Sequence, residues 1–75
     1  MTIKHTETND TQNGKLITAC VKYRNNIYNV NCYKEKNVVM WGAMINAQGA
    51  AKKINKMYVQ DAPKWVQSVF NQVGG

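Results

Sequence analysis

Few side chains in this sequence are suited to acid–base or nucleophilic catalysis, and they lie far apart along the chain. The four carboxylates are Glu7, Asp10, Glu35 and Asp61, and the one histidine is His5. General acid–base catalysis needs titratable groups within hydrogen-bond reach of each other. The sequence also has no Gly-rich phosphate loop and no nucleophile elbow. We therefore predict a binding protein that is not an enzyme.

The two cysteines, Cys20 and Cys32, do not form a recognisable metal or redox motif. They are not a CxxC pair, and together with His5 they show none of the spacings typical of zinc sites. The strand pattern described below places them on opposite faces of a ribbon, which prevents a disulfide between them. We predict two free thiols, with Cys32 buried and Cys20 closer to solvent, and we predict no metal and no cofactor.

Positive charge dominates the composition and gathers in two clusters. The formal net charge is +6 and the sequence pI is about 9.6, an excess that favours nucleic acid or an acidic or nucleoprotein surface as partner. The candidate nucleic-acid-binding residues are Lys22, Arg24, Asn29, Asn31 and Tyr33 on a predicted strand pair, and Lys52, Lys53 and Lys56 on a predicted helix. Such a mixture holds phosphates, hydrogen-bonds base edges and stacks a base. The alternative interpretation is a solvated polar face, which every surface sheet and helix needs.

An unbroken apolar run, Val38–Ile45, supplies more large side chains than a domain of this size readily buries. In a strand, one alternate set of this run packs on the core and the other set needs another contact. We therefore predict Met40, Trp41 and Met44 as protein-interaction residues, since Met and aromatic side chains are enriched at interfaces. Simple core packing is the alternative.

The hairpin Lys15–Lys34 is the element that organises the rest of the chain. Its two alternating runs flank Asn25-Asn26, a pair that tolerates the left-handed backbone of a tight turn. With these two residues as the loop, Val21 lies opposite Val30. The set predicted to face the core is Ile17, Ala19, Val21, Tyr23, Tyr28, Val30 and Cys32. The other face is then mostly polar and basic.

The predicted fold class is α+β, a three-stranded antiparallel meander with two C-terminal α-helices packed on one face. After the strands at 15–24 and 27–34, we predict a third strand over Asn37–Ile45. Its β-branched start and internal glycine favour this strand over a helix beginning at Val38. The predicted helices are Ala47–Tyr58, which follows the capping residue Asn46, and Pro63–Val73, which starts with a proline.

The element order predicted for Lys15–Tyr58, a three-stranded meander followed by a helix, resembles the layout of AP2-type and integrase arm-type DNA-binding domains. In those families the sheet reads a groove of DNA, so the resemblance implies a similar use of the sheet here. It covers the element order and none of the sequence motifs of those families.

The length of 75 residues corresponds to one small domain. Residues 1–14 are polar and end in the turn pair Asn13-Gly14, and we predict a flexible tail there, with an edge strand over Ile3–Thr8 as the alternative. The single α+β domain then covers residues 15–75. No stretch approaches the roughly 20 apolar residues of a membrane span, and the start lacks the apolar run of a secretory signal. We therefore expect a cytoplasmic protein without membrane contact.

Stoichiometric binding of nucleic acid through the basic face of the sheet is the main functional prediction. The composition is rich in Asn and Gln, which is typical of AT-rich phages and mobile elements. The first alternative is therefore a phage-type inhibitor or accessory protein that binds a host protein or nucleoprotein complex in the host cytoplasm. The second alternative is a structural homodimeric subunit.

Overall fold

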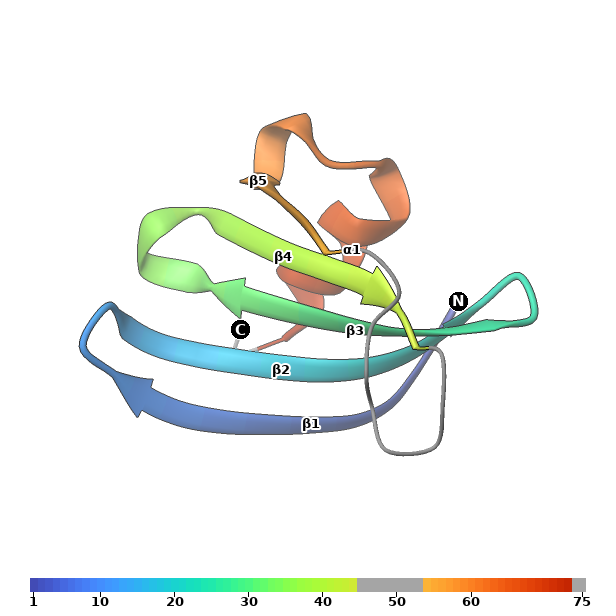
Figure 1. The fold of residues 1–75 in the computed structure, drawn as a ribbon, viewed down its shortest axis with the longest axis horizontal. Coiled ribbons are helices and arrows are strands. Elements are labelled where there is room, and N and C mark those ends of the chain that lie inside the picture. Colours follow the sequence, from blue (N-terminus) through green and yellow to red (C-terminus); the bar gives the residue numbers. More distant parts are fainter. Residues whose placement is uncertain (45–53, 74–75) are drawn as a thin grey trace.

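The chain folds into one curved antiparallel sheet with a short helix behind it (Figure 1). The structure is a computed structural model and describes residues 1–44 and 54–73. In these ranges the sheet has the order β1-β2-β3-β4-β5. The strands are β1 (Thr2–Thr11), β2 (Gly14–Tyr23), β3 (Asn26–Tyr33), β4 (Val38–Ala43) and β5 (Asn55–Tyr58), and the helical segments are η1 (Lys34–Lys36), η2 (Val59–Asp61) and α1 (Lys64–Gln72).

The predicted sheet of three strands with two helices is wrong, and its first omission is β1. Residues 2–11, which we assigned to a flexible tail, pair with β2 from Thr2↔Lys22 to Thr11↔Gly14. The pair Asn13-Gly14 is part of the turn between these strands, where Gly14 has φ of 100°. All of β1 except the half-buried Ile3 is exposed. The edge strand that we gave as the alternative over Ile3–Thr8 is therefore confirmed, although a single half-buried apolar residue is a weak sequence signal for it.

The second correction concerns the predicted helix Ala47–Tyr58. Its last four residues, Asn55–Tyr58, form β5 and pair with β4, with Val38 opposite Tyr58. Residues 47–53 of that predicted helix lie outside the described residues. The layout shared with AP2-type and integrase arm-type domains is therefore not present, because a strand stands where that layout has the end of its helix. The third predicted strand is confirmed as a strand by β4, and the helix Pro63–Val73 is confirmed by α1.

The β2–β3 turn consists of Arg24 and Asn25, one residue earlier than predicted. Their φ angles are 50° and 67°, the positive values that a type I′ hairpin turn requires. Val21 consequently lies opposite Tyr28, and Ala19 lies opposite Val30. The shift changes the cross-strand partner of each residue by two positions along the chain. Because side chains alternate with a period of two, every residue keeps its predicted face.

The core lies between α1 and the face of the sheet turned toward it, called the inner face here. Val21, Val30, Val39, Val66 and Val69 are completely buried there. In the view of Figure 1, α1 lies behind β3 and β4. Burying a valine contributes about 1.5–3 kcal/mol, so these valines are the main attachment of the helix.

Two side chains of the sheet and its connections, Lys34 and Tyr23, contact α1 near its two ends. At its C-terminal end, Lys34 Nζ donates a hydrogen bond to the backbone oxygen of Phe70 and lies 4.3 Å from the centre of the Phe70 ring. A cation at this end also complements the helix dipole. At the other end, the Trp65 ring stacks on Tyr23 with 4.6 Å between centroids. No helix within residues 1–44 and 54–73 is long and apolar enough to cross a membrane.

The position of the turn predicts opposite effects of glycine at two neighbouring sites. Arg24 has a left-handed backbone, which is sterically unfavourable for a residue with a side chain, whereas Asn26 is an ordinary strand residue. We expect Arg24→Gly to be more stable than Asn26→Gly by about 1 kcal/mol or more in urea unfolding. The reverse order would place the loop at Asn25-Asn26 instead.

Candidate nucleic-acid interface

The face of the sheet opposite α1, called the outer face here, carries several cross-strand rows of side chains, and two of these rows reach β5. Directly paired residues share a face, so the register defines both rows. The tyrosine row is Leu16, Tyr33, Val38 and Tyr58, and the lysine row is Thr18, Asn31, Met40 and Lys56. All eight residues are half-buried or exposed. Among the described segments, η2 and α1 pack on the inner face, where Val66 is part of the core and Val59 packs against it.

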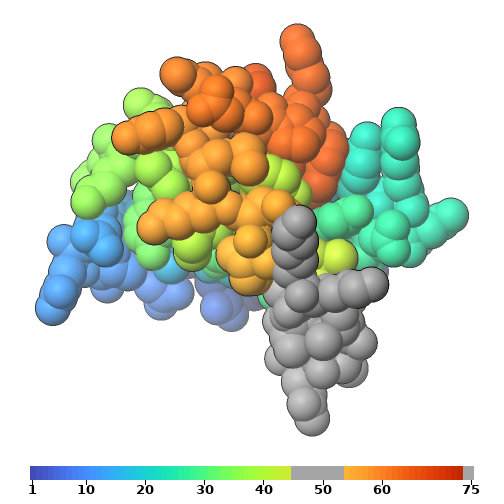
Figure 2. Space-filling view, turned by 45° about the horizontal axis from the view of Figure 1, so that its top comes forward, coloured from blue at the N-terminus to red at the C-terminus, as the bar shows by residue number. Residues whose placement is uncertain are grey.

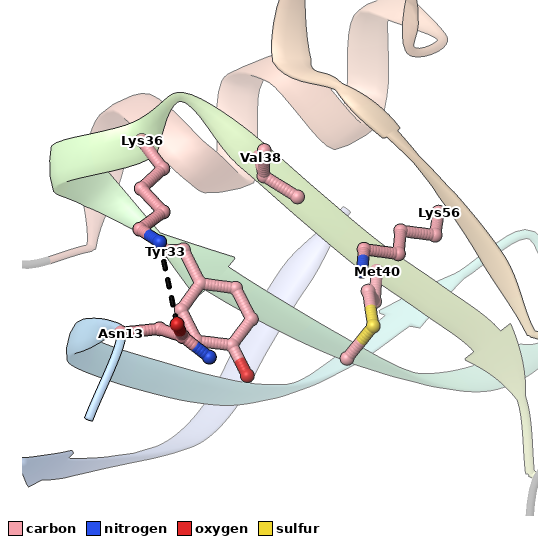
Figure 3. Close-up of a pocket in the computed structure, with 6 residues that line it drawn as sticks. All are labelled: Asn13, Tyr33, Lys36, Val38, Met40 and Lys56. Atoms are coloured by element: carbon pink, nitrogen blue, oxygen red, sulfur yellow. Dashed lines mark hydrogen bonds between the residues drawn. The ribbon is translucent and has the colours of Figure 1, made fainter. Parts of the chain in front are cut away.

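A hollow of about 200 Å³ lies over β3, β4 and β5 on this outer face. It is lined by Asn13, Tyr33, Lys36, Val38, Met40 and Lys56. Figure 3 shows Tyr33 beside Lys36 and Asn13 at one side of the hollow, and Met40 beside Lys56 at the other. One aromatic ring, two apolar side chains and two ammonium groups therefore meet at one place.

The short segment between β3 and β4 positions Lys36 at this hollow. Asn37 has a left-handed backbone with φ of 56°, which ends η1 and reverses the chain into β4. Lys36 Nζ then donates a hydrogen bond to Asn13 Oδ1 at 3.3 Å. The bond joins η1 to the β1–β2 turn, so one ammonium group is held at the rim.

Asn31 lies at the centre of the lysine row, and its amide is engaged within the sheet. Thr18 Oγ1 donates a hydrogen bond to Asn31 Oδ1 at 2.8 Å. Asn31 Nδ2 in turn donates to the backbone oxygen of Met40 at 3.5 Å. These bonds fix the Asn31 side chain within the sheet, and its contact with a base stays a prediction.

The predicted basic residues are not all brought together. Lys56 is exposed and lines the hollow with Tyr33. Lys22 is exposed on the outer face, but it lies four residues along β2 from Thr18, roughly 13 Å from the lysine row. Arg24 lies in the projecting turn (Figure 2), with its guanidinium carbon 5.3 Å from the centre of the Tyr23 ring. Lys52 and Lys53 lie outside the described residues.

The remaining predicted residues divide between the two faces. Asn29 is half-buried in β3 and lies opposite Cys20 and Gly42. Trp41 is 8% exposed and belongs to the core. Met40 in β4 and Met44, which directly follows β4, are half-buried, and alternation places both on the outer face. The predicted protein-interaction trio is therefore not one surface.

Sequence reasoning missed Lys36, Val38, Asn13 and Tyr58 as members of the outer face. Lys36 and Asn13 were assigned to turns, whose spatial neighbours the sequence does not specify. Tyr58 is 60% exposed on a strand, whereas we predicted it as the last residue of a helix. The alternation Lys56-Met57-Tyr58, in which only the central residue packs on the core, is too short to be distinguished from a helical pattern in the sequence.

The charges of Lys36 and Lys56 are not neutralised by a carboxylate within the described part of the chain. There, the one ion-pair contact joins His5 Nε2 and Glu7 Oε1 at 3.3 Å on β1. Both of those side chains are exposed, so the contact contributes little to stability. The two lysines therefore remain available to an anion at the hollow.

The cysteines lie on opposite faces as predicted, and both are free thiols. Cys20 is half-buried on the outer face, whereas Cys32 is fully buried in the core. Burial raises the pKa of Cys32 to about 11, although the nearby Lys34 charge lowers it. Among the described residues, no three His, Cys, Asp or Glu side chains are grouped so that they could hold a metal ion.

In comparisons with known proteins, no family model, no curated protein and no solved structure matches this chain.

The raised pKa of Cys32 predicts a specific loss of stability at high pH. Above its ordinary value of 9.0 the unfolded thiol loses its proton, whereas the folded thiol keeps its proton up to about 11. The free energy of unfolding attributable to Cys32 should therefore fall by about 1 kcal/mol between pH 7 and pH 10. The measurement is urea unfolding in reductant at both pH values. Cys32→Ala is the control and should lack this part of the decrease; an identical decrease in both proteins would contradict the burial of this thiol.

Proposed function

We propose that the protein binds nucleic acid stoichiometrically through the outer face of the sheet. The observation that carries this proposal is the meeting of Tyr33, Lys36 and Lys56 around one hollow. Sheet surfaces that bind nucleic acid combine cations for phosphates with aromatic rings for bases. The hollow offers both kinds of group within one site.

Charge supports a polyanion as the partner. The net charge of the chain is +6, and the two ammonium groups lie at opposite sides of the hollow (Figure 3). A phosphate backbone that crosses the hollow could contact both. Each contact releases counterions from the nucleic acid, so the affinity must fall with salt concentration.

The neutral lining of the hollow suits the bases. Val38 and Met40 supply apolar contact for base faces, and the Tyr33 ring supplies a stacking surface. Binding of this kind forms and breaks no covalent bond. The cytoplasm is the compartment we propose, because Cys20 and Cys32 are free and reducing compartments preserve free thiols.

The test is fluorescence anisotropy of labelled single-stranded and duplex oligonucleotides, titrated with protein from low to physiological salt. The double variant Lys36→Ala/Lys56→Ala should bind more weakly, and its salt dependence should be shallower by roughly one unit of logarithmic slope per lysine. Lys4→Ala/Lys64→Ala is the matched control, because it removes the same charge from exposed positions outside the hollow.

Equal losses in these two double variants would show that only net charge matters and would contradict the proposed interface. Absence of binding by the unmodified protein at physiological salt would remove the proposed function altogether.

One observation favours a second candidate, a protein partner on the same face. Val38 and Met40 are half-buried apolar residues that no core contact requires, and such residues form the centre of many interfaces. A complex with a host protein should persist at high salt, in contrast to a complex with nucleic acid. Retention of a defined protein partner at about 1 M salt, together with no oligonucleotide binding, would favour this candidate.

A further inference from the structure

Resting on the proposed function, we infer that the outer face takes single-stranded nucleic acid, with unpaired bases stacked on Tyr33 and Tyr58. Tyr33 lines the hollow, whereas Tyr58 lies outside it. The register of β3, β4 and β5 and the exposure of Tyr58 support stacking at both positions.

The two tyrosines lie in one line across the sheet. Tyr33 is directly opposite Val38 on β4, and Val38 is directly opposite Tyr58 on β5. Because neighbouring strands are about 4.8 Å apart, the two tyrosines stand roughly 10 Å apart with only Val38 between them. An apolar strip with an aromatic residue at each end is thus part of the outer face.

An ammonium group accompanies each tyrosine. Lys36 lines the hollow beside Tyr33 (Figure 3). Lys56 precedes Tyr58 by two residues on β5, so both side chains lie on the same face. Each tyrosine can therefore stack on one base while the lysine near it contacts one phosphate.

Exposure distinguishes Tyr58 from the aromatic side chains of the inner face, whereas Tyr33 is half-buried and differs from them in lining the hollow. Tyr58 is 60% exposed, although burial of an aromatic ring is strongly favourable. Tyr23, Tyr28 and Trp65 instead pack against one another at the inner face, with centroids 4.6 to 6.5 Å apart, and Tyr23 stacks on Trp65. Tyr58 is thus accessible to a base by its exposure, and Tyr33 is accessible from the hollow that it lines.

The dimensions of the sheet disfavour a duplex on this face. A sheet of five strands is roughly 19 Å across, which exceeds the width of about 12 Å of the major groove of B-DNA. A duplex also keeps its base faces inside the stack, where Tyr33 and Tyr58 cannot reach them. Unpaired bases have free faces, and stacking on them is tolerant of sequence.

The experiment compares a fluorescein-labelled thymidine oligonucleotide of about twelve nucleotides with a hairpin duplex of similar length. We expect the single strand to bind at least tenfold more tightly than the duplex. Tyr58→Leu and Tyr33→Leu should each weaken single-strand binding by roughly five- to hundredfold, the loss expected for one stacked base. Tyr58→Phe and Tyr33→Phe are the matched controls and should bind like the unmodified protein, since they retain the ring.

Tyr58→Leu is the decisive variant, because Tyr58 is 60% exposed and its replacement removes little packing. Far-ultraviolet circular dichroism checks that this variant is folded. Normal single-strand binding by both Leu variants, with a loss in Lys36→Ala/Lys56→Ala, would overturn the stacking while leaving the proposed interface intact. If the duplex binds as tightly as the single strand or more tightly, and if this binding depends on Lys22 and Arg24, the single-strand inference is contradicted. The binding surface would then lie at and beside the β2–β3 turn. No binding to either probe would overturn the proposed function itself.

Discussion

The packing of one short helix on one face of the sheet is the constraint on which the rest of this structure depends. Val66, Val69 and Phe70 of α1 bury the inner face, and Lys34 fixes the C-terminal end of the helix. A helix of nine residues covers only one side of a sheet. The alternate residues of β3, β4 and β5 consequently lie on the other side, where the apolar strip around Val38 and two lysines are left for another contact.

The face of each residue in the central hairpin could be predicted from the sequence, although its exact pairing could not. Alternation from Ile17 to Cys32 distinguishes two faces, and a turn moved by one residue preserves that alternation. The helix α1 was also predictable, because Pro63 and the spacing of Val66, Val69 and Phe70 are strong local signals. Local chemistry determined these elements, so local reasoning found them.

The elements that the sequence did not reveal are those whose structure depends on a distant partner. β1 is polar along its length and is a strand because β2 offers it a hydrogen-bonding edge. β5 has four residues, too few for a period of two to be separated from a helical period, and β4 is its partner. This error moved Lys56 and Tyr58 to the wrong element. Tyr33 and Lys56 were predicted as binding residues, whereas the contributions of Lys36 and Tyr58 required the register.

The central claim, that the outer face of β3, β4 and β5 is the binding surface, is tested most directly by amide chemical-shift mapping. The ¹⁵N-labelled protein would be titrated with a short single-stranded oligonucleotide at physiological salt. Our account predicts that the largest shifts occur at Tyr33, Val38, Lys56 and Tyr58, with little change along α1. Shifts concentrated on α1 or at the Arg24-Asn25 turn would contradict it.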